Sequence, residues 1–312
     1  MSAVNDTKFK SAVFLLTGIP GQEDIQNVWI FLPFSLTYGI SILGNSVILF
    51  IIKTDPSLHE PMYIFLSMLA ITDLGLSIST MPTVLGIYLF NSREICFDVC
   101  FAQLFFIHLL QCIESSMLSW MAFDRFIAIC DPLRYASILT LPKIAKMGLV
   151  CVLRGVAVML PLTILLKQFR YCRVNVLSHS YCMHQEVMKM ACSDIRVNNI
   201  YGLFTKLLTM GLDLLPIFLS YVMILKTVLS IASNAECLRA LNTCVFHLCA
   251  VLVFYTPDIF LSGMYRFGKS SSPVLQILMG YISLLFPPLW NPIVYSVKSK
   301  HLRAKIIRMF IK

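Results

Sequence analysis

The chain has 312 residues, of which 58% are hydrophobic and only 13% are charged, and its mean hydropathy is +0.79. Because soluble domains carry about 25% charged residues, this composition excludes an ordinary soluble domain and predicts a membrane protein. The net charge of +9 does not indicate a nucleic-acid partner, because the basic residues stand in short gaps between apolar runs.

Seven apolar runs follow one another along the chain, and each reaches the roughly 20 residues that a membrane-spanning helix needs. They cover residues 28–53, 61–89, 97–130, 142–166, 198–231, 238–262 and 273–297. The gaps are short apart from residues 167–197, so a second domain has no room. The sequence therefore predicts an all-α membrane protein, a bundle of seven transmembrane helices.

Lysine and arginine near the ends of the spans predict which side faces the cytoplasm. The C-terminal tail is rich in both, with Lys298, Lys300, Arg303, Lys305, Arg308 and Lys312. With an odd number of spans, we expect residues 1–27 to be extracellular, residues 28–297 to form the transmembrane domain, and residues 298–312 to form a cytoplasmic tail with a short amphipathic helix. Asn5 opens an Asn-Asp-Thr acceptor for N-glycosylation, which requires an extracellular position.

Five of the eleven cysteines fall on the expected extracellular side: Cys96, Cys100, Cys172, Cys182 and Cys192. Disulfide bonds persist in such an oxidising compartment. Bonds involving the loop at residues 171–192 would hold it over the mouth of the bundle. Because five is an odd number, one thiol stays free, and we expect it to be Cys96.

Two carboxylic acids lie within apolar spans, Asp73 in the second and Glu114 in the third. An ionisable residue at this depth is a functional candidate by default. Two bare carboxylates repel each other, so either a small cation such as sodium lies between them or one of them takes a proton. Asn291 adds an amide, and Pro292 frees a backbone carbonyl and lets the last span bend.

Polar residues also gather toward the extracellular end. Asp258, Ser262 and Arg266 are four residues apart, so they lie on one slanted face of the sixth span. His108 lies near the outer end of the third span, and Gln185 lies in the long loop. We expect these residues to surround a ligand cavity, with two simpler alternatives: Arg266 extends to the membrane interface, or His108 is a core histidine.

The sequence contains no HExxH, GxSxG or GxxxxGK[ST] pattern, and its cysteine spacing is not typical of a metal site. We therefore expect no enzyme activity and no cofactor other than the possible sodium ion.

Several motifs together resemble the olfactory receptors, in particular their class I, fish-like branch, which are rhodopsin-like G-protein-coupled receptors. The motifs are GN at 44–45, LHEPMYIFLSMLAITDL at 58–74, MAFDRFIAIC at 121–130, SY at 220–221, RALNTCVFH at 239–247, YRFG at 265–268 and PPLWNPIVYSVKSK at 287–300. They follow the family order along essentially the whole chain.

The resemblance implies a role for each matching residue. It implies disulfide bonds Cys100–Cys182 and Cys172–Cys192, and a sodium site at Asp73 and Glu114. It implies that these residues move or switch during activation: Asp124, Arg125, Tyr221, Asn291, Pro292 and Tyr295. It implies that His108, Gln185, Ser262 and Arg266 match positions that bind short carboxylic acids in relatives. It also implies an odorant receptor of the plasma membrane that activates the olfactory stimulatory G protein and raises cyclic AMP.

The sequence departs from the family pattern at several positions on the cytoplasmic side or on moving helices: Phe123, Phe126, Asp131, Phe246 and Trp290. These departures leave the coupling strength open, so a receptor-like protein with weak or no coupling is an alternative, as is a membrane transporter or channel.

Asp258 stands where the family has an aliphatic residue. Unless it is protonated or paired with His108 or Arg266, it repels an anionic odorant by roughly 2–4 kcal/mol at 4–8 Å. A neutral polar or amine-bearing odorant therefore remains as possible as a carboxylic acid.

The neighbouring Asp124 and Arg125 lie at the cytoplasmic mouth of the third span. Adjacent residues point about 100° apart on a helix, so the two side chains need not bond face to face. We expect Arg125 to reach neighbouring helices in the active state, while Asp124 holds it at rest.

Overall fold

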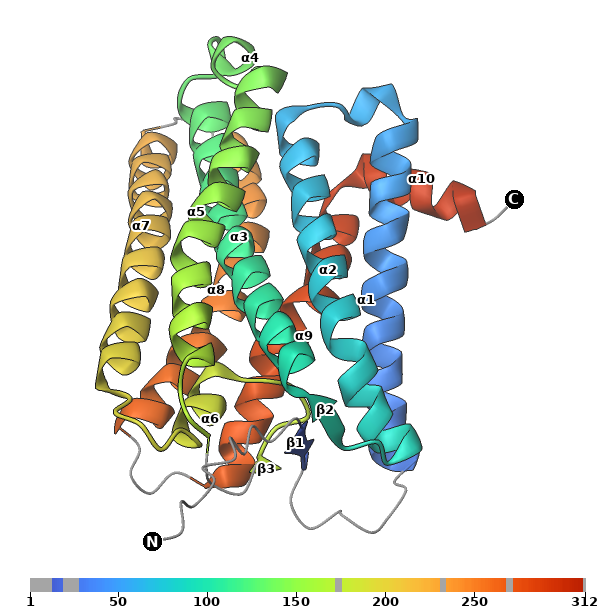
Figure 1. The fold of residues 1–312 in the computed structure, drawn as a ribbon. Coiled ribbons are helices and arrows are strands. Elements are labelled where there is room, and N and C mark those ends of the chain that lie inside the picture. The colour runs from blue at the N-terminus through green and yellow to red at the C-terminus, as the bar shows by residue number, and fades with distance from the viewer. Residues whose placement is uncertain (1–12, 19–27, 172–175, 231–233, 268–271, 311–312) are drawn as a thin grey trace, which may run out of the picture.

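The computed structural model describes residues 13–18, 28–171, 176–230, 234–267 and 272–310. Its main elements are the long helices α1 (Val28–Thr54), α2 (Pro61–Phe90), α3 (Phe97–Cys130), α5 (Leu141–Lys167), α7 (Arg196–Leu229), α8 (Asn234–Phe267) and α9 (Pro273–Lys298). Each is long and apolar enough to cross a membrane, and Figure 1 shows them packed as one bundle. The predicted seven-helix fold is confirmed. The bounds differ most at the sixth span, because α8 continues beyond residues 238–262 at both ends.

Large apolar side chains face outward from the bundle. On α1, Leu36, Leu43 and Phe50 are 61%, 60% and 57% exposed, respectively. A spacing of seven residues places them on one face of the helix, while Asn45 and Ile48 are buried against the neighbouring helices. In water such a face would be unfavourable, so this exposed apolar surface is the one that contacts lipid.

Helix α3 is the centre of the bundle, since it packs against α2, α5, α7 and α8. Its middle turns bury polar side chains, among them Glu114, Ser115 and Ser116. Helix α1 packs against α2 and α9 at one side of the molecule. Polar groups on α3 are therefore within reach of partners on several helices.

The end of the bundle that the sequence predicts to be extracellular carries three short strands, β1 (Val13–Leu16), β2 (Glu94–Cys96) and β3 (Val176–Leu177), and the short helix α6 (His184–Lys189). Strand β1 lies between the other two, antiparallel to β2 and parallel to β3. Alternate residues of β1 point inward, so Phe14 and Leu16 are buried. These strands were not predicted, because two to four residues are too few for a recognisable alternating pattern.

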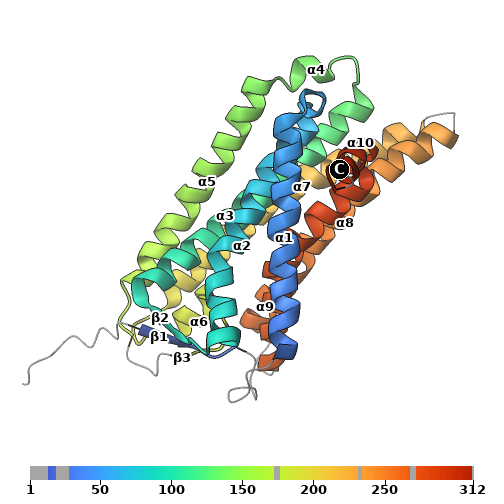
Figure 2. The same cartoon turned by 90° about the vertical axis from the view of Figure 1, so that its right-hand side faces the viewer.

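The other end of the bundle carries a 3₁₀ turn (Pro56–Leu58), α4 (Tyr135–Ile138) and α10 (Lys300–Phe310). Figure 2 shows α4 and α10 toward this end, opposite the strands. In α10, Leu302 is fully buried, and Lys305 Nζ lies 2.7 Å from Asp55 Oδ2. Hydrogen bonds from Lys305 and Ser57 lower the pKa of Asp55 below its usual value. The tail thus contains a helix with one buried apolar side, held to the first loop by an ion pair.

Candidate functional site

A cavity opens beneath the extracellular loop, between α3, α7, α8 and α9. Its empty space is about 440 Å³, including the part that opens to solvent. Apolar side chains form part of the wall, among them Ile107, Leu261 and Leu284. The polar side chains that line it are His108, Gln111, Tyr181, Gln185, Lys206, Asp258, Ser262 and Ser283.

A disulfide bond holds the loop in place over this cavity. Cys100 at the start of α3 bonds to Cys182, with Cα atoms 5.5 Å apart. The Cys182 N–H also donates to Gln103 Oε1 at 2.9 Å, so the bonded loop residue is fixed to α3 twice. The neighbouring loop residues Tyr181 and Gln185 therefore reach the cavity.

The other predicted cysteine roles are only partly visible. Cys96 is a free, exposed thiol. Cys192 is disulfide-bonded, but Cys172, its expected partner, lies outside the described residues. Asn5, the expected glycosylation site, also lies outside them. The Cys172–Cys192 bond and the glycan stay predictions.

Four of the five predicted ligand residues line the cavity: His108, Gln185, Asp258 and Ser262. Arg266 does not. Its guanidinium donates to Asn199 Oδ1 at 2.8 Å in an exposed contact between the ends of α8 and α7. A spacing of four residues exceeds one helical turn, so successive positions drift by about 40° and rise about 6 Å. Two such steps carry Arg266 above the cavity and around the helix, and the expectation that it rims the cavity is corrected.

The structure also changes the expectation for Asp258. Its carboxylate accepts a hydrogen bond from Lys206 Nζ of α7, forming an ion pair across the cavity wall. The sequence suggested His108 or Arg266 as partners and overlooked Lys206. A signal was present, since Lys206 is a charged residue inside an apolar span, which is a functional candidate by default.

Two buried polar atoms at the cavity have no hydrogen-bond partner among the described residues, His108 Nε2 and Gln185 Oε1. Such atoms are uncommon in folded proteins because an unpaired polar group loses its hydration without compensation. Both atoms belong to residues that line the cavity, and both are themselves buried, so the cavity wall contains two polar groups whose hydrogen bonds are not made by the described residues.

The loop above the cavity buries two more histidines. His184 Nε2 lies 2.7 Å from Asn198 Oδ1, and burial lowers the pKa of His184 to about 4. His179 Nε2 lies 2.7 Å from Tyr265 Oη, and burial lowers the pKa of His179 to about 4 as well. Both rings are therefore neutral at physiological pH.

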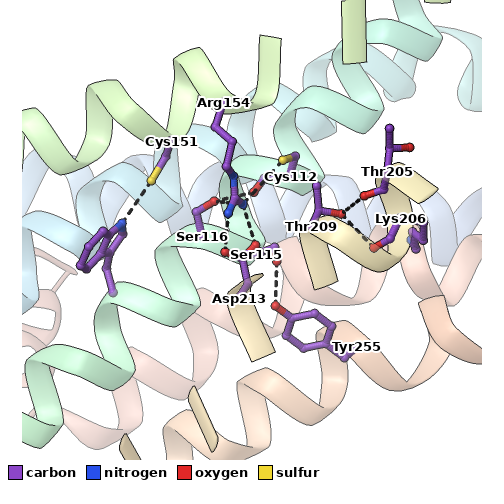
Figure 3. A network of polar contacts seen from close by, with 11 residues as sticks. Cys112, Ser115, Ser116, Cys151, Arg154, Thr205, Lys206, Thr209, Asp213 and Tyr255 are labelled. Carbon is purple, nitrogen blue, oxygen red and sulfur yellow. Dashed lines mark hydrogen bonds and ion pairs between the residues drawn. The ribbon is translucent and has the colours of Figure 1, made fainter. Parts of the chain in front are cut away.

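Below the cavity, a polar network joins four helices (Figure 3). Arg154 of α5 donates from Nη1 to Asp213 Oδ1 at 2.8 Å and from Nη2 to Asp213 Oδ2 at 2.6 Å. Ser116 of α3 accepts from the same Arg154 Nη2 at 2.6 Å. Ser115 donates to Asp213 Oδ2 at 2.6 Å, so the Tyr255 hydroxyl of α8, 2.7 Å away, is the donor to Ser115.

The sequence reasoning missed this network, although Arg154 and Asp213 are charges within apolar spans and the same rule would have found them. What no local pattern shows is that they are partners, because 59 residues separate them along the chain.

At about the same level of α3 as this network, the two intramembrane acids do meet. Asn291 Nδ2 of α9 lies 3.1 Å from Asp73 Oδ2 and 3.2 Å from Glu114 Oε1. Both acids are almost fully buried, with 0% and 2% of their surfaces exposed. The amide of Asn45 donates to the Pro288 carbonyl at 3.0 Å, which links α1 to the proline-containing part of α9. The arrangement brings two carboxylates to one amide donor.

At the cytoplasmic end, Asp124 accepts a hydrogen bond from the Tyr135 hydroxyl of α4 at 2.8 Å. Arg125 Nε lies 4.0 Å from Asp124 Oδ2, so the neighbouring residues form only a long ion pair. Burial, together with the nearby Asp124 carboxylate, raises the pKa of Tyr135. Tyr135, which the sequence reasoning did not single out, thus brings a hydroxyl to Asp124 from the loop.

The remaining residues of the expected activation set are also buried between helices. The Tyr221 hydroxyl of α7 lies 2.7 Å from His247 Nδ1 of α8. The Tyr295 hydroxyl of α9 donates weakly to the Met121 sulfur at 3.8 Å. Pro292 lies inside α9, where its Cβ and Cγ lie close to Gly44 of α1.

Comparisons with known proteins agree over nearly the whole chain. A family model described as "Olfactory receptor" matches residues 34–312. Olfactory receptor 51G2 of Homo sapiens is 58% identical over 306 residues, which cover 98% of this chain and 97% of that protein. Olfactory receptor 51G1 of Homo sapiens is 54% identical over 310 residues, covering 99% and 96%. Olfactory receptor 51A7 of Homo sapiens is 54% identical over 307 residues, covering 98% and 97%.

Proposed function

This chain belongs to the olfactory receptor family, and on that premise we propose that it binds its odorant in the cavity beneath the loop that Cys100 and Cys182 anchor. It is an odorant-sensing G-protein-coupled receptor, a multi-pass protein of the plasma membrane and not an enzyme. Membership in a receptor family leaves the transporter or channel alternative without support.

One observation carries the choice of cavity. Asp258, Leu261 and Ser262 of α8 line it, and Tyr255 lies about one turn below Asp258 on the same helix. A molecule in the cavity therefore contacts the part of α8 that Tyr255 ties to Ser115 of α3, and Ser115 in turn bonds to Asp213 of α7. Because a ligand shifts an equilibrium only through different affinities for two states, a displacement of α8 is the route by which an odorant would stabilise an active state.

The signal would then pass to a stimulatory, olfactory-type heterotrimeric G protein that raises cyclic AMP. Residues 1–27 would be extracellular, residues 28–297 would form the receptor domain, and residues 298–312 would be the cytoplasmic tail. Asp124, which accepts a hydrogen bond from Tyr135 and lies 4.0 Å from Arg125, would hold Arg125 in the resting state. Opening of the bundle would separate Arg125 from Asp124, which makes this pair a two-state element.

A cyclic AMP assay in cells that express the olfactory G protein tests this function. We expect at least one member of a broad odorant panel to raise cyclic AMP, and Arg125→Gln to abolish the response at equal surface expression.

Weak or absent coupling is the second candidate, because Phe123 and Phe126 have no hydroxyl beside the Asp124–Arg125 pair. Silence of the whole panel despite surface expression would favour it.

We further propose that Asp73 and Glu114 hold a sodium ion. The residues fit the ion, because carboxylate oxygens are the ligands that hard cations prefer, and two buried acids here share a single amide donor. A bound cation would offset their mutual repulsion, which a shared proton would also do.

Melting the purified receptor in sodium and in choline salts separates these alternatives. Sodium should raise Tm for the wild type and not for Asp73→Asn. Equal Tm in both salts would favour the shared proton.

A further inference from the structure

The wall of the cavity contains one basic and one acidic side chain that form an ion pair with each other, Lys206 and Asp258. Of the 14 residues that line it, Lys206 and Asp258 carry a formal charge at neutral pH and the other 12 do not. The Lys206 ammonium donates directly to the Asp258 carboxylate. Their side chains are 33% and 17% exposed, so the pair is partly open and is not sealed in the core. The cavity is therefore electrically balanced before any ligand enters.

This balance disfavours ligands of either charge. A carboxylate that approaches Lys206 also approaches Asp258, and it must either lie beside a like charge or draw the lysine away from its partner. An ammonium group that approaches Asp258 must likewise either lie beside the positive charge of Lys206 or draw the aspartate away from it. A charge that loses its partner in a low-dielectric site is left uncompensated, which is unfavourable. The cavity therefore binds both kinds of ion less tightly than a neutral molecule.

The two unpaired polar atoms, His108 Nε2 and Gln185 Oε1, restrict the chemical class of the ligand further. Gln185 Oε1 has no partner among the described residues, and a carbonyl oxygen can only accept a hydrogen bond. The ligand group that satisfies it must carry a donor, which an ionised carboxylate, an ester or a ketone lacks. His108 Nε2, also without a partner among these residues, either donates or accepts according to its tautomer. A hydroxyl group can serve both atoms, since it donates one hydrogen bond and accepts others.

The remaining wall suits a hydrocarbon chain, because Ile107, Leu261 and Leu284 face the same space. We propose that the odorant of this receptor is a small neutral alcohol, recognised through Gln185 and His108 beside the closed Lys206–Asp258 pair. This inference rests on the proposed function that the cavity is the odorant site, and it narrows the three classes that the sequence leaves open to one.

The test uses three probes of equal chain length: 1-hexanol, hexanoate and hexylamine. Two readouts are taken on the full chain, the ligand-induced shift in Tm of purified receptor and the cyclic AMP response in cells. For the wild type we expect 1-hexanol to raise Tm at concentrations about tenfold or more below the other two probes, and cyclic AMP to follow the same order.

Single substitutions that remove one partner of the ion pair should change which of the three probes the receptor binds best. Asp258→Asn leaves Lys206 without its anion, so we expect affinity for hexanoate to rise about tenfold. Lys206→Met leaves Asp258 without its cation, so affinity for hexylamine should rise by a similar factor. A misfolded variant loses all ligands and cannot gain one, which keeps the test independent of folding.

Two further variants complete the set. Gln185→Leu removes the hydrogen-bond acceptor and should lower the affinity for 1-hexanol about tenfold. Asp98→Asn is the matched control for Asp258→Asn, because Asp98 pairs with Lys167 outside the cavity, and it should change no probe's rank.

The inference is overturned if hexanoate or hexylamine stabilises the wild type most, if no probe shifts Tm, or if Asp258→Asn gains no affinity for hexanoate. A Tm shift with 1-hexanol that raises no cyclic AMP would instead contradict the proposed signalling and leave the ligand class standing.

Discussion

Two ion pairs bind α7 to its neighbours, and they differ in how completely their atoms are satisfied. Lys206–Asp258 lines the cavity and joins α7 to α8 by a single hydrogen bond. Arg154–Asp213 lies about two turns further along the bundle, and its forked guanidinium bonds to both carboxylate oxygens.

The side chain of Asp213 is only 4% exposed, against 17% for Asp258, and Ser115 adds a further hydrogen bond to Asp213. Similar charges thus serve two purposes. Where few bonds hold the pair and space remains beside it, a ligand can compete. Where every oxygen is bonded and buried, the pair ties the bundle together.

The largest expected effect comes from breaking the buried pair. Asp213→Leu leaves the Arg154 guanidinium without its anion inside the bundle, so we expect a loss of about 3–5 kcal/mol in the free energy of unfolding. Thermal melting of purified receptor and its surface expression measure this loss. The double variant Arg154→Met/Asp213→Leu should recover most of it, because an apolar pair of similar size leaves no charge uncompensated. If Asp213→Leu destabilises no more than Asp258→Leu, the distinction between the two pairs is wrong.

Lowering the pH should reveal the contribution of the loop above the cavity to stability, because this loop contains buried histidines. Burial lowers the pKa of His184 to about 4, whereas an unperturbed histidine titrates near 6.5. Between these values the unfolded chain binds more protons than the folded one, so stability is full above pH 6.5 and falls as the pH decreases toward 4. The slope is at most about 1.4 kcal/mol per pH unit for one histidine.

Melting curves from pH 7 to pH 5 measure this effect. His184→Gln should flatten the decline, and His179→Gln/His184→Gln should flatten it further, because burial lowers the pKa of His179 to about 4 too. An unchanged decline in the double variant would contradict the assignment.

A smaller effect is expected where the buried network meets α8. Tyr255→Phe removes the hydroxyl that donates to Ser115 but leaves the Arg154–Asp213 pair intact. We expect a loss of about 0.5–1.5 kcal/mol in the free energy of unfolding. Because α8 is then held less firmly to α3, basal cyclic AMP should rise at equal surface expression. Unaltered basal cyclic AMP would show that Tyr255 contributes to stability alone.

The smallest effect is expected from removing the cavity pair altogether. Lys206→Met/Asp258→Leu takes away both partly exposed charges, and such pairs contribute about 0–1 kcal/mol. Tm should therefore shift little, while discrimination among the charged odorant probes weakens. A large drop in Tm would mean that this pair is structural, like Arg154–Asp213.

The sequence by itself determined the membrane-spanning architecture. A bilayer requires about 20 apolar residues per helix, and that constraint is local, so runs such as residues 97–130 could be delimited without any tertiary information. It also singled out Asp73, Glu114 and Asn291, because polar groups are conspicuous in apolar runs, and the structure brings all three together.

Only the tertiary structure decided the partners of the charged residues. Asp258 pairs with Lys206, 52 residues away, and Arg266 bonds to Asn199 instead of lining the cavity. The strands of the extracellular cap likewise pair segments far apart in the chain. The physical reason is that hydropathy depends on neighbours in sequence, whereas pairing depends on how each helix is rotated and how far each side chain reaches in the packed bundle.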